Sequence, residues 1–250
     1  MMRAVRFASQ LGFDIDEVTY DGICRQADRI KIITKERIIV ELNKLMESPV
    51  PSIGLGLLRT TGLLKHILPE LDNMAGVERR GKHAHKDNFE HTMKVLDNLA
   101  KRTDDIWLRW AALFHDIGKP QTKAYDPHHG WTFHQHEAVG SKMIPQLFRR
   151  LKLPTNEPMR FVQKMVFLHM RPIVLSEDMV SDSAVRRLLF EAGDDVEKLM
   201  MLCEADITSG NDNKVQLYLK NFELVRRKMQ DLEERDRVRN FQPPITGDMI

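Results

Sequence analysis

The sequence predicts an all-α protein. Apolar residues recur at intervals of three and four through most of the chain, and segments that alternate apolar with polar residues are nearly absent. With 250 residues and 42% hydrophobic content, the chain can bury a sizeable core, as one large domain or two small ones. We therefore expect a folded helical protein, and we assign its helices in order.

Residues 1–73 are expected to form a first helical bundle. Its expected elements are helices at 3–12, 17–28 and 35–47, followed by short helices within 51–71. Gly12 ends the first helix, and Thr34 caps the third, in which Glu36 falls close to the capping-box position. The core of this bundle is expected to include Leu57, Leu58, Leu63, Leu64, Ile67 and Leu68.

A polar segment, ERRGKHAHKD, separates this bundle from a second unit that we place at 83–210. The helices expected after it are 88–102, 105–116, 136–151, 156–169, 181–192, 194–209 and 212–239. The last helix and the start of a further region make up 211–250. Its apolar stripe consists of Tyr218, Phe222, Val225, Met229 and Leu232. Such spacing is typical of a core contact or an intramolecular seam more often than of a partner site.

Composition excludes several classes of protein. Thirty-eight Lys and Arg against 36 Asp and Glu give a net charge of +2, so any RNA contact must come from a local basic patch. The two cysteines, Cys24 and Cys203, are widely separated and form no CxxC pair, so neither a disulfide framework nor a thiolate zinc site is indicated, and a reducing cytoplasm fits best. No run approaches the ~20 apolar residues of a membrane span, so we expect a cytoplasmic protein without a membrane partner. No feature sets an oligomeric state.

Both ends of the chain favour an internal piece of a longer protein. An amphipathic helix begins at once in RAVRFASQLGF with no capping residue before it. The last residues, PPITGDMI, place Thr246 as a cap for a helix that does not follow.

The most informative motif is ALFHDIGKP, in which His115 and Asp116 close an apolar helical run. An ionised Asp116 beside Leu113 and Phe114 would be costly without a partner, which favours a metal ligand. Other residues extend the pair into a candidate ligand set: His91, His136, His169 and Asp206. Imidazole and carboxylate without thiolate suit Mg, Mn, Fe, Co, Ni or Zn. Taken singly, each could instead be a hydrogen-bonded core residue or a helix cap.

The motifs FEHT, LFHDIGK, HE at a helix start, LHMR and EADITSG together resemble the HD-type metal-dependent phosphohydrolase domain, over about 83–210. The resemblance implies one ion bound by His91, His115, Asp116 and Asp206. It implies a second ion at His136 and His169, with Asp116 as the bridge. The family commonly has Gly before the third histidine, where this chain has Gln135, and His134 is a rival ligand.

The chemistry that this resemblance implies is in-line attack on phosphorus by a water whose pKa the metal lowers. Asp116 and Lys119 are the expected catalytic residues, and Lys119 and Arg171 would hold non-reacting phosphate oxygens. A solvated surface base is the alternative for both of these cations. The remaining histidines outside the ligand set are expected in solvent-facing loops and receive no role: His83, His85, His128 and His129.

The front of the chain, RAVRFASQLGFDID and ITKERIIVELNKLMESPVPSIGLGLLRTTGLLKHILPEL, closely resembles the segment that follows the catalytic head of bacterial CCA-adding tRNA nucleotidyltransferases and poly(A) polymerases. In that family Arg3 and Arg6 fall in a motif that helps to bind the incoming nucleotide, ATP or CTP for the full-length parent. They could equally be solvated residues of an amphipathic helix. No Gly-Ser followed by DxD occurs, so we expect no nucleotide addition by these residues alone.

The leading hypothesis is the RNA-binding neck and HD domain of a CCA-adding tRNA nucleotidyltransferase, with a phosphodiesterase or phosphatase site acting on a nucleotide or other phosphoester. One alternative is a metal-free RNA-binding scaffold, and another is a stand-alone HD nucleotidase. For tRNA or other RNA, the expected phosphate contacts are Arg25, Arg29, Lys31, Lys35 and Arg37.

Overall fold

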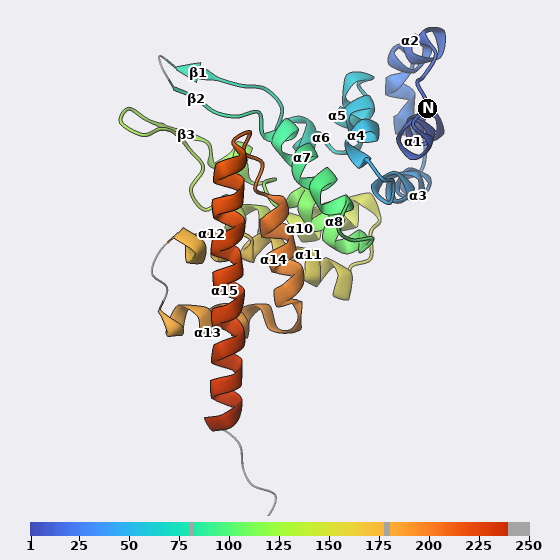
Figure 1. Cartoon of the computed structure of the whole chain (residues 1–250). Coiled ribbons are helices and arrows are strands. Elements are labelled where there is room, and N and C mark those ends of the chain that lie inside the picture. The colour runs from blue at the N-terminus through green and yellow to red at the C-terminus, as the bar shows by residue number, and fades with distance from the viewer. Residues whose placement is uncertain (81–82, 178–180, 240–250) are drawn as a thin grey trace, which may run out of the picture.

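The computed structural model describes residues 1–80, 83–177 and 181–239, and this part of the chain is dominated by helices (Figure 1). The N-terminal set is α1 (Met2–Leu11), α2 (Glu17–Arg25), a 3-10 helix at Ala27–Ile32, α3 (Lys35–Met46), α4 (Pro51–Thr60), α5 (Leu64–Ile67) and α6 (Pro69–Asp72). The next set is α7 (Asn88–Ala100), α8 (Ile106–Phe114), α9 (Lys119–Thr122), α10 (His136–Leu151) and α11 (Glu157–Leu168). The last set is α12 (Met170–Glu177), α13 (Asp182–Ala192), α14 (Val196–Ala205) and α15 (Asp212–Arg239). The predicted all-α class is confirmed.

Strands occur in two short antiparallel hairpins among the described residues. One pairs β1 (Arg79–Arg80) with β2 (His83–Ala84), and the other pairs β3 (Ala124–Asp126) with β4 (Gly130–Thr132). Both project from one side of the helical body, away from α1 to α3 (Figure 1).

Several element boundaries differ from those expected. The helix expected at 105–116 ends at Phe114, and the one expected at 194–209 is a 3-10 turn at Gly193–Asp195 followed by α14. Helix α12 was not expected at all, because Pro172 is as typical of a loop as of a first helical turn. Thr34 stands at the N-cap of α3, but its side chain makes no capping hydrogen bond. Thr246, the expected cap near the C-terminus, lies outside the described residues.

Gly12 ends α1 as expected. Its φ of 66° lies in the left-handed region that glycine enters without a Cβ penalty. Its backbone N–H donates to the carbonyl of Ala8 at 3.0 Å. The helix therefore ends at this residue, and the chain leads on to α2.

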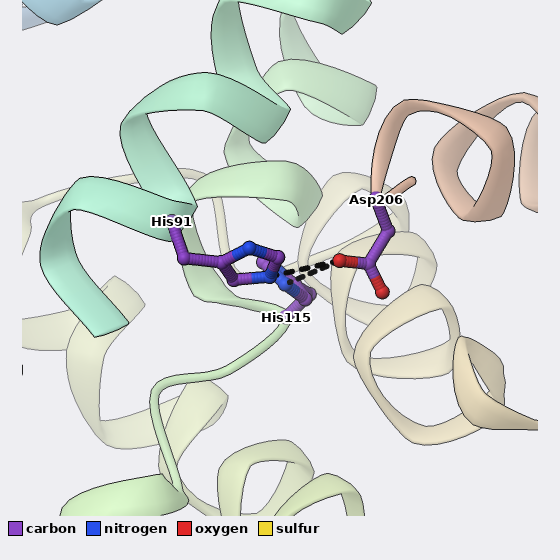
Figure 2. Close-up of side chains that lie close together, drawn as sticks. All are labelled: His91, His115 and Asp206. Carbon is purple, nitrogen blue, oxygen red and sulfur yellow. Dashed lines mark ion pairs between the residues drawn. The ribbon is translucent and has the colours of Figure 1, made fainter. Parts of the chain in front are cut away.

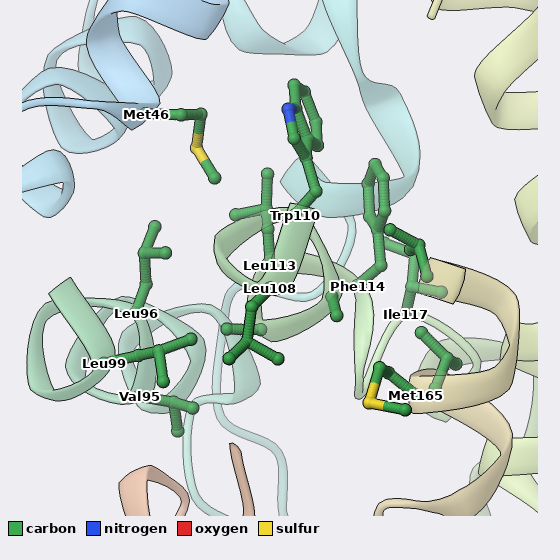
Figure 3. Close-up of a cluster of buried hydrophobic side chains, with 14 of the residues drawn as sticks. Met46, Val95, Leu96, Leu99, Leu108, Trp110, Leu113, Phe114, Ile117 and Met165 are labelled. Atoms are coloured by element: carbon green, nitrogen blue, oxygen red, sulfur yellow. The ribbon is translucent and has the colours of Figure 1, made fainter. Parts of the chain in front are cut away.

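Helix α8 runs through the centre of the hydrophobic core (Figure 3). Leu108, Trp110, Leu113 and Phe114 are at most 1% exposed. They pack between α7, which contributes Val95, Leu96 and Leu99, and α11, which contributes Met165. Met46 reaches the same cluster from α3, so the N-terminal helices and the rest of the chain share one hydrophobic core.

A buried arginine joins the N-terminal helices to the remainder. Arg109 on α8 is 2% exposed, and its Nη1 donates to the carbonyls of Met46 at 2.8 Å and Ser48 at 3.1 Å. Its other nitrogens donate to the carbonyls of Ala100 and Thr103 and to the Asp104 carboxylate. The guanidinium thus satisfies carbonyls at the end of α3 and in the α7–α8 connection at once.

Helix α15 packs along α12, α13 and α14. Phe222, Val225, Met229 and Leu232 are buried and Tyr218 is half-buried, so the expected core role of the apolar stripe is confirmed. Among the described residues, no helix has the length and apolar character that crossing a membrane requires.

Candidate metal centre

The six candidate ligands reach one place from five helices. His91 lies in the second turn of α7, and His115 and Asp116 follow the end of α8. His136 is the first residue of α10, while His169 and Asp206 stand directly after α11 and α14. Because most of these positions are helix ends, the packing of the five helices sets the distances between the side chains.

A glycine permits the HDIG turn to lie against α10. A Cβ on Gly118 would stand 2.2 Å from the carbonyl oxygen of His136 and 2.7 Å from the backbone nitrogen of Gly140. Both contacts are with backbone atoms that cannot rotate away. Glycine at 118 therefore lets His115 and Asp116 approach the start of α10 closely.

The residue before the third histidine adopts a backbone conformation that favours glycine. Gln135 has φ 61° and ψ 21°, in the left-handed region. This turn points His136 inward, with 8% of its side chain exposed, whereas His134 is exposed to solvent. The structure thus brings His136, and not the rival His134, to the other ligands.

The first group of donors is His91, His115 and Asp206 (Figure 2). His91 Nε2 lies 2.8 Å and His115 Nε2 3.7 Å from Asp206 Oδ1. The same two nitrogens lie 3.5 Å and 3.3 Å from Asp116 Oδ2.

The second group is Asp116, His136 and His169. Asp116 Oδ1 lies 3.2 Å from His136 Nε2 and 3.9 Å from His169 Nε2, and the two nitrogens are 3.3 Å apart. Asp116 therefore turns one oxygen toward each group.

All four histidines present Nε2 to the centre because Nδ1 has a partner elsewhere. The Nδ1 atoms of His115, His136 and His169 donate to backbone carbonyls three residues earlier in the chain, at 2.7 to 2.9 Å. His91 Nδ1 lies 2.9 Å from Thr208 Oγ1. In a neutral ring, a donor role for Nδ1 leaves a lone pair on Nε2, which is the tautomer that a metal ligand needs.

These donor separations fit divalent cations. At metal–ligand distances of about 2.1 Å, neighbouring donors stand about 3.0 Å apart in an octahedral set and about 3.4 Å apart in a tetrahedral set. The separations between 2.8 and 3.9 Å bracket both values. In addition, His115 Nε2 is buried and has no hydrogen-bond partner. A buried polar atom without a partner is costly, and a bound cation would remove that cost.

Electrostatics keep both carboxylates ionised. Burial opposes the charge on Asp116, but His115 and Lys119 outweigh it and hold its pKa well below the usual range. Burial likewise opposes the charge on Asp206, and the hydrogen bond from His91 together with the His115 charge lowers its pKa. Burial and the charge of His115 lower the pKa of His169 to about 4, so that ring is neutral at pH 7. Burial opposes the charge on His115, but Asp116 and Asp206 outweigh it and raise its pKa to about 9, so without a cation this ring carries a proton that metal binding would displace.

The expected phosphate-binding cations occupy different places. Lys119 Nζ lies 2.6 Å from Asp116 Oδ2, at the metal centre. Arg171 Nη1 instead pairs with Glu191 Oε2 at 2.9 Å, and Arg171 lines a cavity of about 520 Å³ that includes none of the six candidate ligands.

The expected nucleotide-binding residues, Arg3 and Arg6, lie on α1, a helix that carries none of the six candidate ligands (Figure 1). Arg6 Nε pairs with Glu41 Oε2 at 2.7 Å, and Arg3 Nε lies 3.6 Å from the other oxygen of the same carboxylate. The Arg6 side chain is 12% exposed, so it is held against α3 and is not a solvated residue.

Of the basic residues expected to contact RNA, Arg25, Arg29 and Arg37 are exposed and Lys35 is half-buried. Lys31 is exposed and pairs with Asp28 at 3.1 Å.

Two histidines differ from the solvent-facing loop residues that we expected. His83 and His85 are half-buried, because the two hairpins pack together. The His85 ring lies edge-on to Trp131 at 5.5 Å, and His83 contacts Tyr125 at 6.4 Å.

Sequence reasoning also missed Thr208, which orients His91. Its position two residues after Asp206, in the motif DITSG, was the sequence feature from which it could have been found.

Comparison with known proteins connects this site to a family. Residues 12–74 match the family model described as "Probable RNA and SrmB- binding site of polymerase A", and residues 88–210 match the HD domain.

An A-adding tRNA nucleotidyltransferase of Deinococcus radiodurans is 36% identical, over 82% of this chain and 47% of that protein. The chain belongs to the tRNA nucleotidyltransferase and poly(A) polymerase family. A CC-adding tRNA nucleotidyltransferase of Thermus thermophilus is 33% identical, over 82% of this chain and 48% of that protein. A multifunctional CCA protein of Methylococcus capsulatus is 31% identical, over 82% and 50%. This tRNA nucleotidyltransferase family member spans about half the length of the curated relatives it matches.

Proposed function

We propose that residues 83–210 form a metal-dependent phosphohydrolase and that residues 1–73 form an RNA-contacting neck, together serving tRNA 3′-end processing. The observation that carries the first part is the paired donor set. Two groups of nitrogen and oxygen donors share Asp116, and each oxygen of that carboxylate faces one group. A shared carboxylate between two groups of ligands is the geometry of two-metal hydrolytic sites.

In this proposal His91, His115 and Asp206 would hold one divalent ion, His136 and His169 would hold another, and Asp116, which faces both groups, would contribute to both sites. Such ions would supply Lewis-acid chemistry, which lowers the pKa of a water and offsets phosphate charge. Asp116 is buried and ionised, so it contributes a fixed negative charge between the two groups. The backbone carbonyls and Thr208 hold the imidazole rings in one orientation before any ligand arrives.

Lys119 contributes a second fixed charge. Its ammonium lies 2.6 Å from Asp116 Oδ2 and 20% of the side chain is exposed, so it is within reach of a phosphate oxygen at the centre. We propose that it donates to a non-reacting oxygen of the phosphoester as negative charge develops there. Arg171 could serve a larger substrate that extends toward its own cavity.

Hydrolysis of a generic phosphodiester, bis(p-nitrophenyl) phosphate, tests this proposal. We expect activity that requires added divalent metal, is abolished by chelator, and falls at least a hundredfold in His115→Ala. His134→Ala is the matched control, because His134 is exposed and lies two residues before the candidate ligand His136. Activity that survives both chelator and His115→Ala would contradict the proposal, whereas the absence of both bound metal and hydrolysis would favour a metal-free RNA-binding scaffold instead.

We further propose that the complete protein adds nucleotides to tRNA, using ATP or CTP, as the names of its relatives indicate. In that setting Arg3 and Arg6 would contact the incoming nucleotide, with Glu41 holding both guanidiniums in place. Equilibrium binding of ATP to the complete protein, with and without Arg6→Ala, tests this assignment. Unchanged affinity would contradict it.

A further inference from the structure

Two of the six candidate ligands, His91 and Asp206, are more exposed than the others. The side chains of His115, Asp116 and His169 are 1 to 2% exposed, whereas those of His91 and Asp206 are 15% and 16% exposed. A cavity of about 360 Å³ lies against His91 and Asp206. This cavity therefore leads to the centre on the side of His91 and Asp206.

Two lysines line the cavity, and neither was singled out by the sequence. Lys86 precedes α7, and Lys214 lies in the first turn of α15. Both side chains are exposed, and neither forms an ion pair in the part of the chain that the structure describes. Asp206 is the acidic residue of the lining, and it belongs to the candidate ligands. The two ammonium groups are thus available to an anion.

Local structure fixes where these lysines stand. Asn211 Oδ1 accepts a hydrogen bond from the backbone nitrogen of Lys214 at 3.2 Å, and Ser209 Oγ accepts one from the backbone nitrogen of Asn211 at 3.2 Å. Beside Lys86, Asp87 caps α7 by accepting from Glu90 N at 3.0 Å. Each lysine therefore projects from a capped helix start at the rim of the cavity.

Part of the cavity lining is aromatic and apolar. It consists of Tyr218 and Phe222 on α15, with Ile173 on α12 and Cys203 on α14. Phe222 is 1% exposed, so the half-buried Tyr218 offers the ring surface that a ligand can reach. An aromatic surface beside two cations suits a phosphate ester that carries a planar base.

We propose that Lys86 and Lys214 bind the phosphate of the substrate, and that Tyr218 stacks on its base, which makes the substrate class of the metal centre a nucleotide or the terminal nucleotide of an RNA. This assignment rests on the phosphohydrolase proposed above. It makes α15, which begins beyond the residues that match the HD domain, a part of the substrate site.

Binding of AMP, inorganic phosphate and adenosine to the whole 250-residue chain, measured by calorimetry with Mg²⁺ present, tests the assignment. We expect Lys86→Gln and Lys214→Gln each to weaken AMP and phosphate about tenfold, because each loses a charge-assisted hydrogen bond. Tyr218→Leu should weaken AMP and adenosine and leave phosphate unchanged. Lys220→Gln, an exposed lysine on the same helix that does not line the cavity, is the matched control.

Elemental analysis and hydrolysis of the same variants separate this assignment from the proposed function. All variants should retain the metal content of the parent, since none replaces a candidate ligand. If metal and hydrolysis are present but AMP affinity is equal in Lys214→Gln and Lys220→Gln, the assignment is wrong and the phosphohydrolase stands. If AMP binding depends on both lysines but hydrolysis never appears, the site stands and the phosphohydrolase is wrong.

Discussion

Two buried polar regions of this molecule are satisfied in opposite ways. Around Arg109, each nitrogen of a buried guanidinium donates to carbonyl or carboxylate oxygens, and the region is complete within the chain. Around Asp116, nitrogens and oxygens of six side chains point at one another, and His115 Nε2 has no hydrogen-bond partner.

The difference separates a structural joint from a binding centre. A buried charge that is fully hydrogen-bonded has its desolvation cost offset within the chain, so no ligand is needed and the loss of either partner is costly. A buried cluster of lone pairs around a carboxylate is completed by a cation. Variants at the two regions should therefore differ in how metal changes their stability, and the following predictions use that difference.

The largest effect is expected at the joint. Arg109→Met keeps much of the apolar stem but leaves the carbonyls of Met46, Ser48 and Thr103 without their donor, so we expect unfolding free energy to fall by about 3 kcal/mol or more. Urea denaturation measures it. The stabilisation of the variant by added divalent metal should equal that of the parent, because the metal centre is intact. If metal no longer stabilises a folded Arg109→Met, the two regions are not independent.

The next effect concerns His136, the first residue of α10, and His134, which lies two residues before it. A ligand that binds only the folded state at a hundred times its Kd stabilises by about 2.7 kcal/mol, so the parent should melt at a higher temperature with metal. His136→Gln should lose a measurable share of this shift, whereas His134→Gln should keep it, since His134 is exposed. Thermal shift with and without metal decides between them. Equal losses would contradict the placement of His136 at the centre.

A smaller effect is expected for RNA. Reversing charge in Lys35→Glu with Arg37→Glu should weaken tRNA binding severalfold, and affinity should fall with salt because binding releases counterions. Lys101→Glu, an exposed lysine outside the N-terminal helices, is the control. Filter binding over a salt series measures both effects. Salt-independent binding, or a loss as large in the control, would show that RNA is bound elsewhere.

The smallest effect is expected at Gln135. Its left-handed backbone penalises any residue with a Cβ, so Gln135→Gly should raise stability by about 0.5 kcal/mol after the greater freedom of glycine in the unfolded chain is subtracted. Urea denaturation measures the change, with Gln121→Gly, in a helix and not at positive φ, as a destabilising control. A loss of stability in Gln135→Gly would show that the side chain of Gln135 contributes more than the backbone costs.

The helix order and the candidate ligands were accessible from sequence for a shared reason. Helical periodicity fixes the elements, and the motifs around His91, His115 and Asp206 each lie at a recognisable point of a helix. Whether these residues bind metal is the proposal made above, and the sequence alone left a hydrogen-bonded core as the alternative. What the structure adds is that the donor atoms of both groups converge on Asp116.

Other features depend on contacts between distant segments, which local patterns do not encode. Arg109 stands in the apolar run IWLRWAALF, and nothing local shows that the end of α3 supplies its acceptors. Lys86 and Lys214 belong to different parts of the sequence, and they line the same cavity because α14 packs against both α7 and α15. The β3–β4 hairpin is too short to show an alternating pattern, although Pro127 and Gly130 bracket its turn.

Titration calorimetry with Mn²⁺ on single-ligand variants tests the central claim most directly. The claim predicts two ions per chain, one for each donor group. Asp206→Asn should remove one of them, His169→Gln the other, and Asp116→Ala should weaken both, because Asp116 is the only residue that faces both groups among those described. An Asp116→Ala variant that binds Mn²⁺ with the stoichiometry and affinity of the parent would contradict the account.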